Sequence, residues 1–126
     1  MTTLYDTGVL IAAERDSRAV WADHRVRLEL GLIPVTTAPV VAQVSRSARQ
    51  VQLHRFLRGC EVISFEPSHA KAVGALLAAT SLTDVVDAHV IIAAAQLSTP
   101  TVVTSDPKDL AQLADQATTP IAIRSI

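Results

Sequence analysis

The stretch LYDTGVL, residues 4–10, indicates the fold class of this chain. Leu4 and Tyr5 suit a short strand that breaks at Asp6, and the apolar residues from Val9 to Ala13 suit a short buried helix. Asp6 is therefore expected where a strand gives way to a helix. Strand and helix candidates alternate in the same manner through the rest of the chain, which predicts a mostly parallel sheet with helices on both faces.

Outward from this stretch, the pattern predicts the order β-α-α-β-α-α-β-α-α-β-α-β. Pro39, Pro67 and Pro107 suit the first turns of helices, and Gly31 suits a helix end. Pro34 falls within a short strand candidate and indicates an edge position or a late strand start. We expect strands at 3–5, 32–36, 60–65, 101–104 and 121–123, and helices at about 9–13, 17–30, from 39, 50–58, 67–79, 85–97 and 107–113.

Length and composition favour one aliphatic domain. The chain has 126 residues, of which 49% are hydrophobic and only 3% aromatic, so we expect a single domain over residues 1–126 and no all-β sandwich. Cys60 is the only cysteine, which excludes an internal disulfide or a thiolate zinc cluster. The chain has no pattern of a secretory signal and no apolar run long enough to span a membrane. We therefore expect a soluble, cytoplasmic protein.

Charge is distributed unevenly although the net charge is only -1. Residues 1–60 hold eight Arg against five acids, a balance of +3, whereas residues 61–126 hold three basic residues against seven acids, a balance of -4. The arginine-rich half has two interpretations, an ordinary solvated helix face or a surface that follows a phosphate backbone.

Carboxylates far apart in the sequence are predicted to meet at one edge of the sheet. Asp6 and Asp106 follow the first and fourth strands, and Asp84 and Asp87 lie at the start of a helix whose N-terminus points to the same edge. Asp6, Asp84 and Asp106 could instead be simple helix N-caps. Asp87 differs because it lies within an apolar helix, where a partly buried charge needs a partner or a metal.

Such a cluster suits hydrolysis with a bound metal. Carboxylate oxygens select Mg²⁺ or Mn²⁺ over zinc, and a metal-bound water can attack a phosphodiester without a protein nucleophile. Phosphate-binding glycine loops and the hydrolase nucleophile elbow are absent. Cys60 is interpreted as an inert core thiol. The four histidines are interpreted as surface or core-edge residues: His24, His54, His69 and His89.

Three segments together resemble a known family. Residues 4–12 (LYDTGVLIA), 84–90 (DVVDAHV) and 102–110 (VVTSDPKDL) are similar in order and spacing to the motifs of the PIN domain, in particular of the VapC-like toxins of bacterial toxin–antitoxin pairs. The resemblance implies a three-layer α/β fold with a mostly parallel sheet of four to five strands. It also implies a metal-dependent endoribonuclease that acts on RNA, forms a homodimer and is inhibited by a cognate VapB-like antitoxin.

The resemblance also implies roles for particular residues. The family's acids fall on Asp6, Asp87 and Asp106, which are the expected catalytic residues and ligands of Mg²⁺ or Mn²⁺. The family's hydroxyl position falls on Thr104, and Asp109, three residues after Asp106, is a plausible auxiliary.

One position departs from the family pattern. In residues 38–46 the family usually carries a Glu, and this chain has Gln43. A Gln offers a carbonyl oxygen but no charge, so metal affinity should fall, and Asp84 is the candidate that replaces the missing carboxylate as a ligand. Arg46, one turn later, could contact the scissile phosphate, pair with the acids, or form an ordinary surface ion pair.

Three hypotheses follow. The first is a Mg²⁺- or Mn²⁺-dependent ribonuclease toxin. The second is a catalytically weakened PIN-fold protein that binds RNA or a partner, which Gln43 favours. The third, a phosphoacceptor receiver domain, needs a second acid beside Asp6 and a late-strand Lys, and the chain has neither.

Overall fold

A five-stranded parallel sheet forms the centre of the computed structural model, which describes residues 1–126. The strands follow the order β3-β2-β1-β4-β5, and the predicted sequence of elements is confirmed. The strands are β1 (Thr2–Tyr5), β2 (Val35–Thr37), β3 (Glu61–Ile63), β4 (Pro100–Thr104) and β5 (Ala122–Ser125). The helices are α1 (Thr7–Glu14), α2 (Arg18–Glu29), α3 (Ala38–Val44), α4 (Val51–Arg58), α5 (Pro67–Ala78), α6 (Val85–Ala94) and α7 (Pro107–Ala114).

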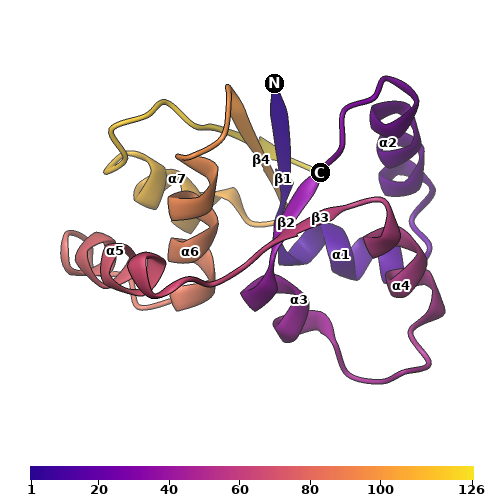
Figure 1. The fold of residues 1–126 in the computed structure, drawn as a ribbon, viewed down its shortest axis with the longest axis horizontal. Coiled ribbons are helices and arrows are strands. Elements are labelled where there is room, and N and C mark those ends of the chain that lie inside the picture. The colour runs from indigo at the N-terminus through magenta and orange to yellow at the C-terminus, as the bar shows by residue number, and fades with distance from the viewer.

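Helices cover both faces of the sheet and make three layers. The ribbon shows α1, α2 and α4 on one side of the strands and α5, α6 and α7 on the other (Figure 1). The short helix α3 lies below the carboxyl ends of the strands and contacts both α1 and α6. The longest helices, α2 and α5, have 12 residues each, and none of the helices combines the length and apolar character needed to cross a membrane.

The strands β1 and β4 lie side by side at the middle of the sheet. Their register pairs Tyr5 with Val103, although the chain visits β2 and β3 between them. Right-handed crossovers place α1, α2 and α4 on one face, whereas α5 and α6, between β3 and β4, and α7, between β4 and β5, cover the opposite face. Both faces of β1 and β4 are therefore buried, and Leu4 and Val102 are completely inaccessible to solvent.

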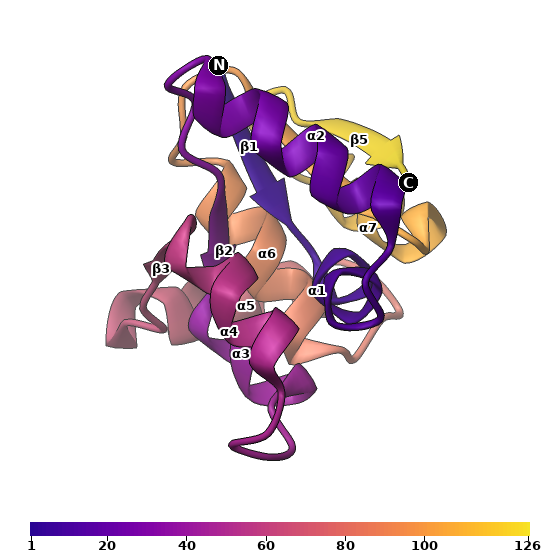
Figure 2. The same ribbon diagram turned by 90° about the vertical axis from the view of Figure 1, so that its right-hand side faces the viewer.

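Local sequence chemistry explains several element boundaries. The side chain of Ser17 accepts a hydrogen bond from Val20 N at the start of α2, and Thr37 accepts one from Val40 N at the start of α3. Gly31, with a φ of 73°, follows the end of α2, as its position in the sequence predicted. Figure 2 shows α2 lying across the face of the molecule in front of β1.

The two largest errors in the predicted boundaries are three residues each. The second strand begins at Val35 instead of Leu32, because Pro34 has no N–H for a ladder bond, although its carbonyl accepts from Glu61 N. The helix α6 ends at Ala94, and the chain leaves it in a turn before Leu97. Neither change moves the ends of strands at which the acids were expected.

His24, His69 and His89, which were expected at the surface or at the edge of the core, are buried. His24 stacks on Phe56 with ring centroids 4.0 Å apart, and the Tyr5 hydroxyl lies 2.9 Å from His24 Nδ1. His69 and His89 contact each other, with 3.0 Å between His69 Nδ1 and His89 Nε2. His24 and His89 find their polar partners on elements distant in sequence, so the local pattern could not reveal their burial, whereas His69 also accepts from Glu66 N at the start of its own helix.

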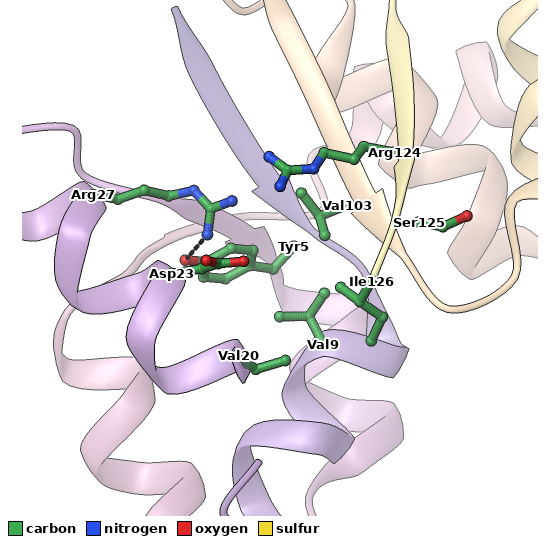
Figure 3. Close-up of a pocket in the computed structure, with 9 residues that line it drawn as sticks. All are labelled: Tyr5, Val9, Val20, Asp23, Arg27, Val103, Arg124, Ser125 and Ile126. Carbon is green, nitrogen blue, oxygen red and sulfur yellow. Dashed lines mark hydrogen bonds between the residues drawn. The ribbon is translucent and has the colours of Figure 1, made fainter. Parts of the chain in front are cut away.

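Hydrogen bonds among the side chains of Arg27, Tyr5 and His24 link α2 to the sheet. Arg27 Nη1 donates to Tyr5 Oη over 3.2 Å, as Figure 3 shows, and its guanidinium also lies over the Tyr5 ring. Because an Arg can only donate, the Tyr5 oxygen accepts from Arg27, and its own proton goes to His24 Nδ1. A Tyr5 hydroxyl that donates to Nδ1 requires the neutral His24 tautomer with its proton on Nε2. Burial raises the pKa of Tyr5 to about 12 and lowers the pKa of His24.

Candidate metal centre

The carboxyl ends of β1 and β4 hold Asp6 beside Thr104. Thr104 Oγ1 donates to Asp6 Oδ2 over 2.8 Å and accepts from Asp106 N over 3.1 Å. Thr104 is completely buried, and Asp6 is 6% exposed. One threonine hydroxyl thus orients the Asp6 carboxylate and holds the backbone from which Asp106 projects.

Asp6 Oδ1 is buried and has no hydrogen-bond partner. A buried carboxylate oxygen normally accepts several hydrogen bonds, and an unsatisfied one is costly. The unpaired oxygen is therefore an acceptor that a cation would satisfy. It is the feature of this site that points most directly to a ligand.

Asp6, Asp84 and Asp106 could each have been a simple helix N-cap, and only Asp84 makes a capping hydrogen bond. Asp84 Oδ1 accepts from Asp87 N over 3.0 Å at the start of α6, which is a regular N-cap. Asp6 and Asp106 occupy the N-cap positions of α1 and α7, but neither side chain makes a capping hydrogen bond. Their carboxylates are consequently available for another partner.

Asp87 lies in the electrostatic field of the other acids. Its side chain is half-buried on the first turn of α6. Desolvation by burial raises the pKa of Asp87 to about 7, with further upward contributions from the negative charges of Asp84, Asp6, Asp109 and Asp106, in that order. The sequence prediction that these carboxylates converge at one edge of the sheet agrees with this electrostatic coupling.

A cleft of about 140 Å³ opens at the junction of α6 and α7 beside the acids. Three of the carboxylates, those of Asp84, Asp87 and Asp109, line it. Its volume corresponds to roughly four water molecules, which is enough for an ion that keeps part of its hydration shell. The remaining lining residues are Ser81, Leu82, Thr83 and Leu113.

The donor chemistry fits a hard divalent cation, whereas the spacing of the side chains does not yet form a coordination shell. All of the acids offer oxygen, and Asp6 contributes an unpaired one. No group of three or more His, Cys, Asp or Glu side chains is arranged so that it could hold an ion directly. Coordination therefore requires side-chain rotations within the cluster, which exposed Asp106 and half-buried Asp87 can make.

Gln43 and Arg46 both have hydrogen-bond partners within the protein. Thr7 Oγ1 donates to Gln43 Oε1 over 2.7 Å, so the carbonyl oxygen expected to face a metal already has a partner. Arg46 Nη1 instead contacts carbonyl oxygens at the end of its own helix, those of Ala42 and Ser45, at 3.4 and 2.9 Å. No ion pair between Arg46 and the acid cluster forms in this arrangement.

Sequence inspection missed the close approach that holds the two strand ends together. A Cβ added to Gly8 would lie 2.0 Å from Ser105 Oγ and 2.6 Å from Ser105 Cβ. Only glycine lets the first turn of α1 pack against the loop between β4 and α7. The glycine two residues after Asp6 was a signal, but its contact with Ser105 depends on the tertiary fold.

Comparison with known proteins identifies the fold. No family model and no curated protein sequence matches this chain. A chain in the crystal structure of VapBC2 from Rickettsia felis, bound to a DNA fragment from their promoter, superposes with a TM-score of 0.73 over 100% of this chain and 99% of that chain. The two sequences are 17% identical, so this likeness concerns the fold. The expected PIN-like α/β class, with its parallel sheet between helices, is confirmed.

Proposed function

We propose that this protein is a Mg²⁺- or Mn²⁺-dependent endoribonuclease of the VapC type. The observation that carries the proposal is the buried, unpaired Asp6 Oδ1 beside a group of acids whose charges act on Asp87. Asp6, Asp87 and Asp106 are the proposed ligands and catalytic residues, with Asp84 and Asp109 on the wall of the adjoining cleft. A bound cation would supply the Lewis acidity that activates water towards a phosphodiester.

The protein's own groups would prepare this chemistry in distinct ways. Thr104 fixes Asp6 Oδ2 and leaves Oδ1 free to bind the cation. Asp87, whose pKa is about 7, would lose its proton to solvent when a cation binds, because the positive charge favours the carboxylate. Asp84 holds the first turn of α6 through its contact with Asp87 N.

The arginines and the acids of the proposed centre lie mainly in different layers of the fold, and this separation of charge suits RNA binding. All eight arginines of residues 1–60 lie on α2, on α4 or on the segments that follow α1 and α3, and α1, α2 and α4 form one layer of the fold. The acids of the proposed centre come mainly from α6 and α7 in the opposite layer. An RNA backbone could follow the basic layer and present one phosphodiester to the acids at the carboxyl edge of the sheet.

The direct test is cleavage of RNA by the purified protein with and without Mn²⁺ or Mg²⁺. We expect cleavage that requires the metal and disappears in Asp6→Asn, which keeps the size of the side chain but removes its charge. Asp16→Asn, at an exposed position in the turn after α1, should cleave as the wild type does. Metal-independent cleavage, or full activity of Asp6→Asn, would contradict the proposal.

We further propose that the protein acts in the cytoplasm as the toxin of a toxin–antitoxin pair, as a homodimer inhibited by a VapB-like antitoxin. The shared fold with a chain of a VapBC2 complex supports this role. A small adjacent open reading frame whose product co-purifies with this protein and relieves growth arrest is the expected finding. Free growth during expression of this protein alone would argue against a toxin.

A second function is favoured by the Gln43 contact. Because Gln43 Oε1 accepts from Thr7, the centre lacks the oxygen ligand that a Glu would supply. The second proposed function is therefore a PIN-fold protein that binds RNA or a partner without efficient cleavage. Calorimetric titration with Mn²⁺ separates the two functions. Binding below millimolar concentration favours the enzyme, and absence of binding favours the binding protein.

A further inference from the structure

The only hydrogen bond of the Gln43 side chain turns its amide oxygen towards α1. Thr7 Oγ1 donates to Gln43 Oε1 over 2.7 Å, and Thr7 is the first residue of α1, directly after Asp6. Gln43 is exposed on the last turn of α3. Its amide nitrogen, with two N–H groups, is consequently left without a protein partner.

The free end of this side chain is a hydrogen-bond donor. A primary amide accepts through its oxygen and donates through its nitrogen, so a cation would bind the oxygen and a phosphate would bind the N–H groups. A Glu at this position could accept from Thr7 with one oxygen and still offer the other to a cation. Gln43 offers N–H donors in the same place, so this position would attract an anion where a Glu would attract a cation.

The surroundings of Gln43 make a donor useful. The helix α3, which carries Gln43, contacts both α1 and α6, and Asp6 and Asp84 immediately precede these two helices. A phosphate near five carboxylates is repelled unless donors hold it. Arg46 already contacts the carbonyls of Ala42 and Ser45, whereas the N–H groups of Gln43, beside the start of α1, have no protein partner.

We propose that Gln43 binds a non-bridging phosphate oxygen of RNA through its amide N–H groups and is not a ligand of the metal. This inference rests on the proposed function of the acid cluster. Thr7 is the positioning residue, because its hydroxyl holds the amide oxygen and thereby directs the nitrogen away from α1.

Two affinities measured separately test the inference. Binding of a fluorescent single-stranded RNA is followed by anisotropy in EDTA, where no cleavage occurs, and binding of Mn²⁺ is followed by calorimetry without RNA. We expect Gln43→Ala to weaken RNA binding about fivefold, the loss of one solvent-exposed hydrogen bond to a charged group, and to leave the Mn²⁺ Kd within about twofold. Gln43→Glu should tighten Mn²⁺ binding and weaken RNA binding.

Control variants separate a contact from a general disturbance. Thr7→Val should weaken RNA binding as Gln43→Ala does, whereas Thr7→Ser, which keeps the hydroxyl, should restore it. Gln116→Ala, at an exposed position after α7, should leave both affinities unchanged.

The inference is overturned if Gln43→Ala weakens Mn²⁺ binding about tenfold, because Gln43 is then a ligand. It is also overturned if RNA affinity is the same in wild type and Gln43→Ala. A wild type that binds RNA through Gln43 but binds no Mn²⁺ would instead refute the proposed nuclease function and leave the Gln43 contact in place.

Discussion

Thr104 and Asp6 are 98 positions apart in the sequence, and the hydroxyl of Thr104 donates to Asp6 Oδ2 over 2.8 Å. The contact joins the ends of β1, the central strand of the sheet, and its neighbour β4. It satisfies one oxygen of a buried carboxylate and leaves the other without a partner. The strength of the proposed metal site should therefore depend on a residue that does not itself bind the metal.

Replacing Thr104 with Val keeps the shape of the side chain and removes the hydroxyl. We expect Thr104→Val to lower the free energy of unfolding by about 1–3 kcal/mol, because Asp6 Oδ2 would remain buried without a donor. The Mn²⁺ affinity should fall as well, since Asp6 loses its orientation. Urea denaturation and calorimetry measure the two effects, and Thr104→Ser should retain most of both. Equal stability of wild type and Thr104→Val would show that the contact contributes nothing.

The pKa of about 7 at Asp87 predicts that stability without metal falls as the pH rises. A carboxyl whose pKa is higher in the folded than in the unfolded chain contributes stability that is complete below the unfolded value of 3.8 and is lost as the pH rises through about 7. Asp87→Asn should thus raise the melting temperature at pH 8 and change it little at pH 4. The gain at pH 8 should be about 1 kcal/mol, because water screens a half-buried group.

Thermal melts of metal-free protein between pH 4 and pH 8 would measure this difference. Asp16→Asn, in an exposed turn where Asn tolerates the φ of 61°, should follow the wild-type profile. Parallel profiles for wild type and Asp87→Asn would contradict the electrostatic coupling.

The contact of Gly8 with Ser105 predicts a large effect from one methyl group. Gly8→Ala should lower the free energy of unfolding by about 1–3 kcal/mol and impair Mn²⁺ binding, because α1 must move away from the loop that carries Asp106. Gly74→Ala is the matched control: it lies within α5, and a Cβ there meets nothing within 4 Å. The control should stabilise the protein by about 0.5–1 kcal/mol, since alanine favours a helix. Denaturation curves that show the same change for both variants would exclude the steric explanation.

Tyr5 is the only tyrosine of the chain, so its ionisation can be followed by ultraviolet absorbance without overlap. Burial raises the pKa of Tyr5 to about 12, and we expect no tyrosinate absorbance at pH 10 while the protein is folded. Tyr5→Phe should destabilise the protein by about 1–2 kcal/mol, because His24 Nδ1 would lose its donor in a buried position. Titration of the folded protein near pH 10 would contradict the buried Arg27–Tyr5–His24 arrangement.

The order of the elements could be predicted from the sequence because its determinants are local. Proline at helix starts, Gly31 after α2 and short aliphatic runs mark the elements without reference to distant residues. The convergence of Asp6, Asp87 and Asp106 followed from topology alone, since the ends of parallel strands and the starts of their helices share an edge. The site roles of these acids remain predictions.

The features that could not be predicted all depend on contacts between distant segments. The missing charge at Gln43 was visible in the sequence, but its hydrogen bond with Thr7 joins residues 36 positions apart. The burial of His24 depends on Tyr5 and Phe56 in the same way. Periodicity describes one element at a time, so it cannot assign the partner of a polar side chain that leaves its own element.

The pairing of β4 with β1 also determines when the acidic centre can form during synthesis. Asp6 leaves the ribosome early, but its neighbour Thr104 belongs to a strand that pairs with β1 only after about a hundred residues have been translated. A nascent chain that still lacks β4 has no partner for Asp6 and no Asp106. Ribosome-bound fragments should therefore be inert towards the RNA around them, and an active centre would appear only as the final quarter of the polypeptide folds into the middle of the sheet.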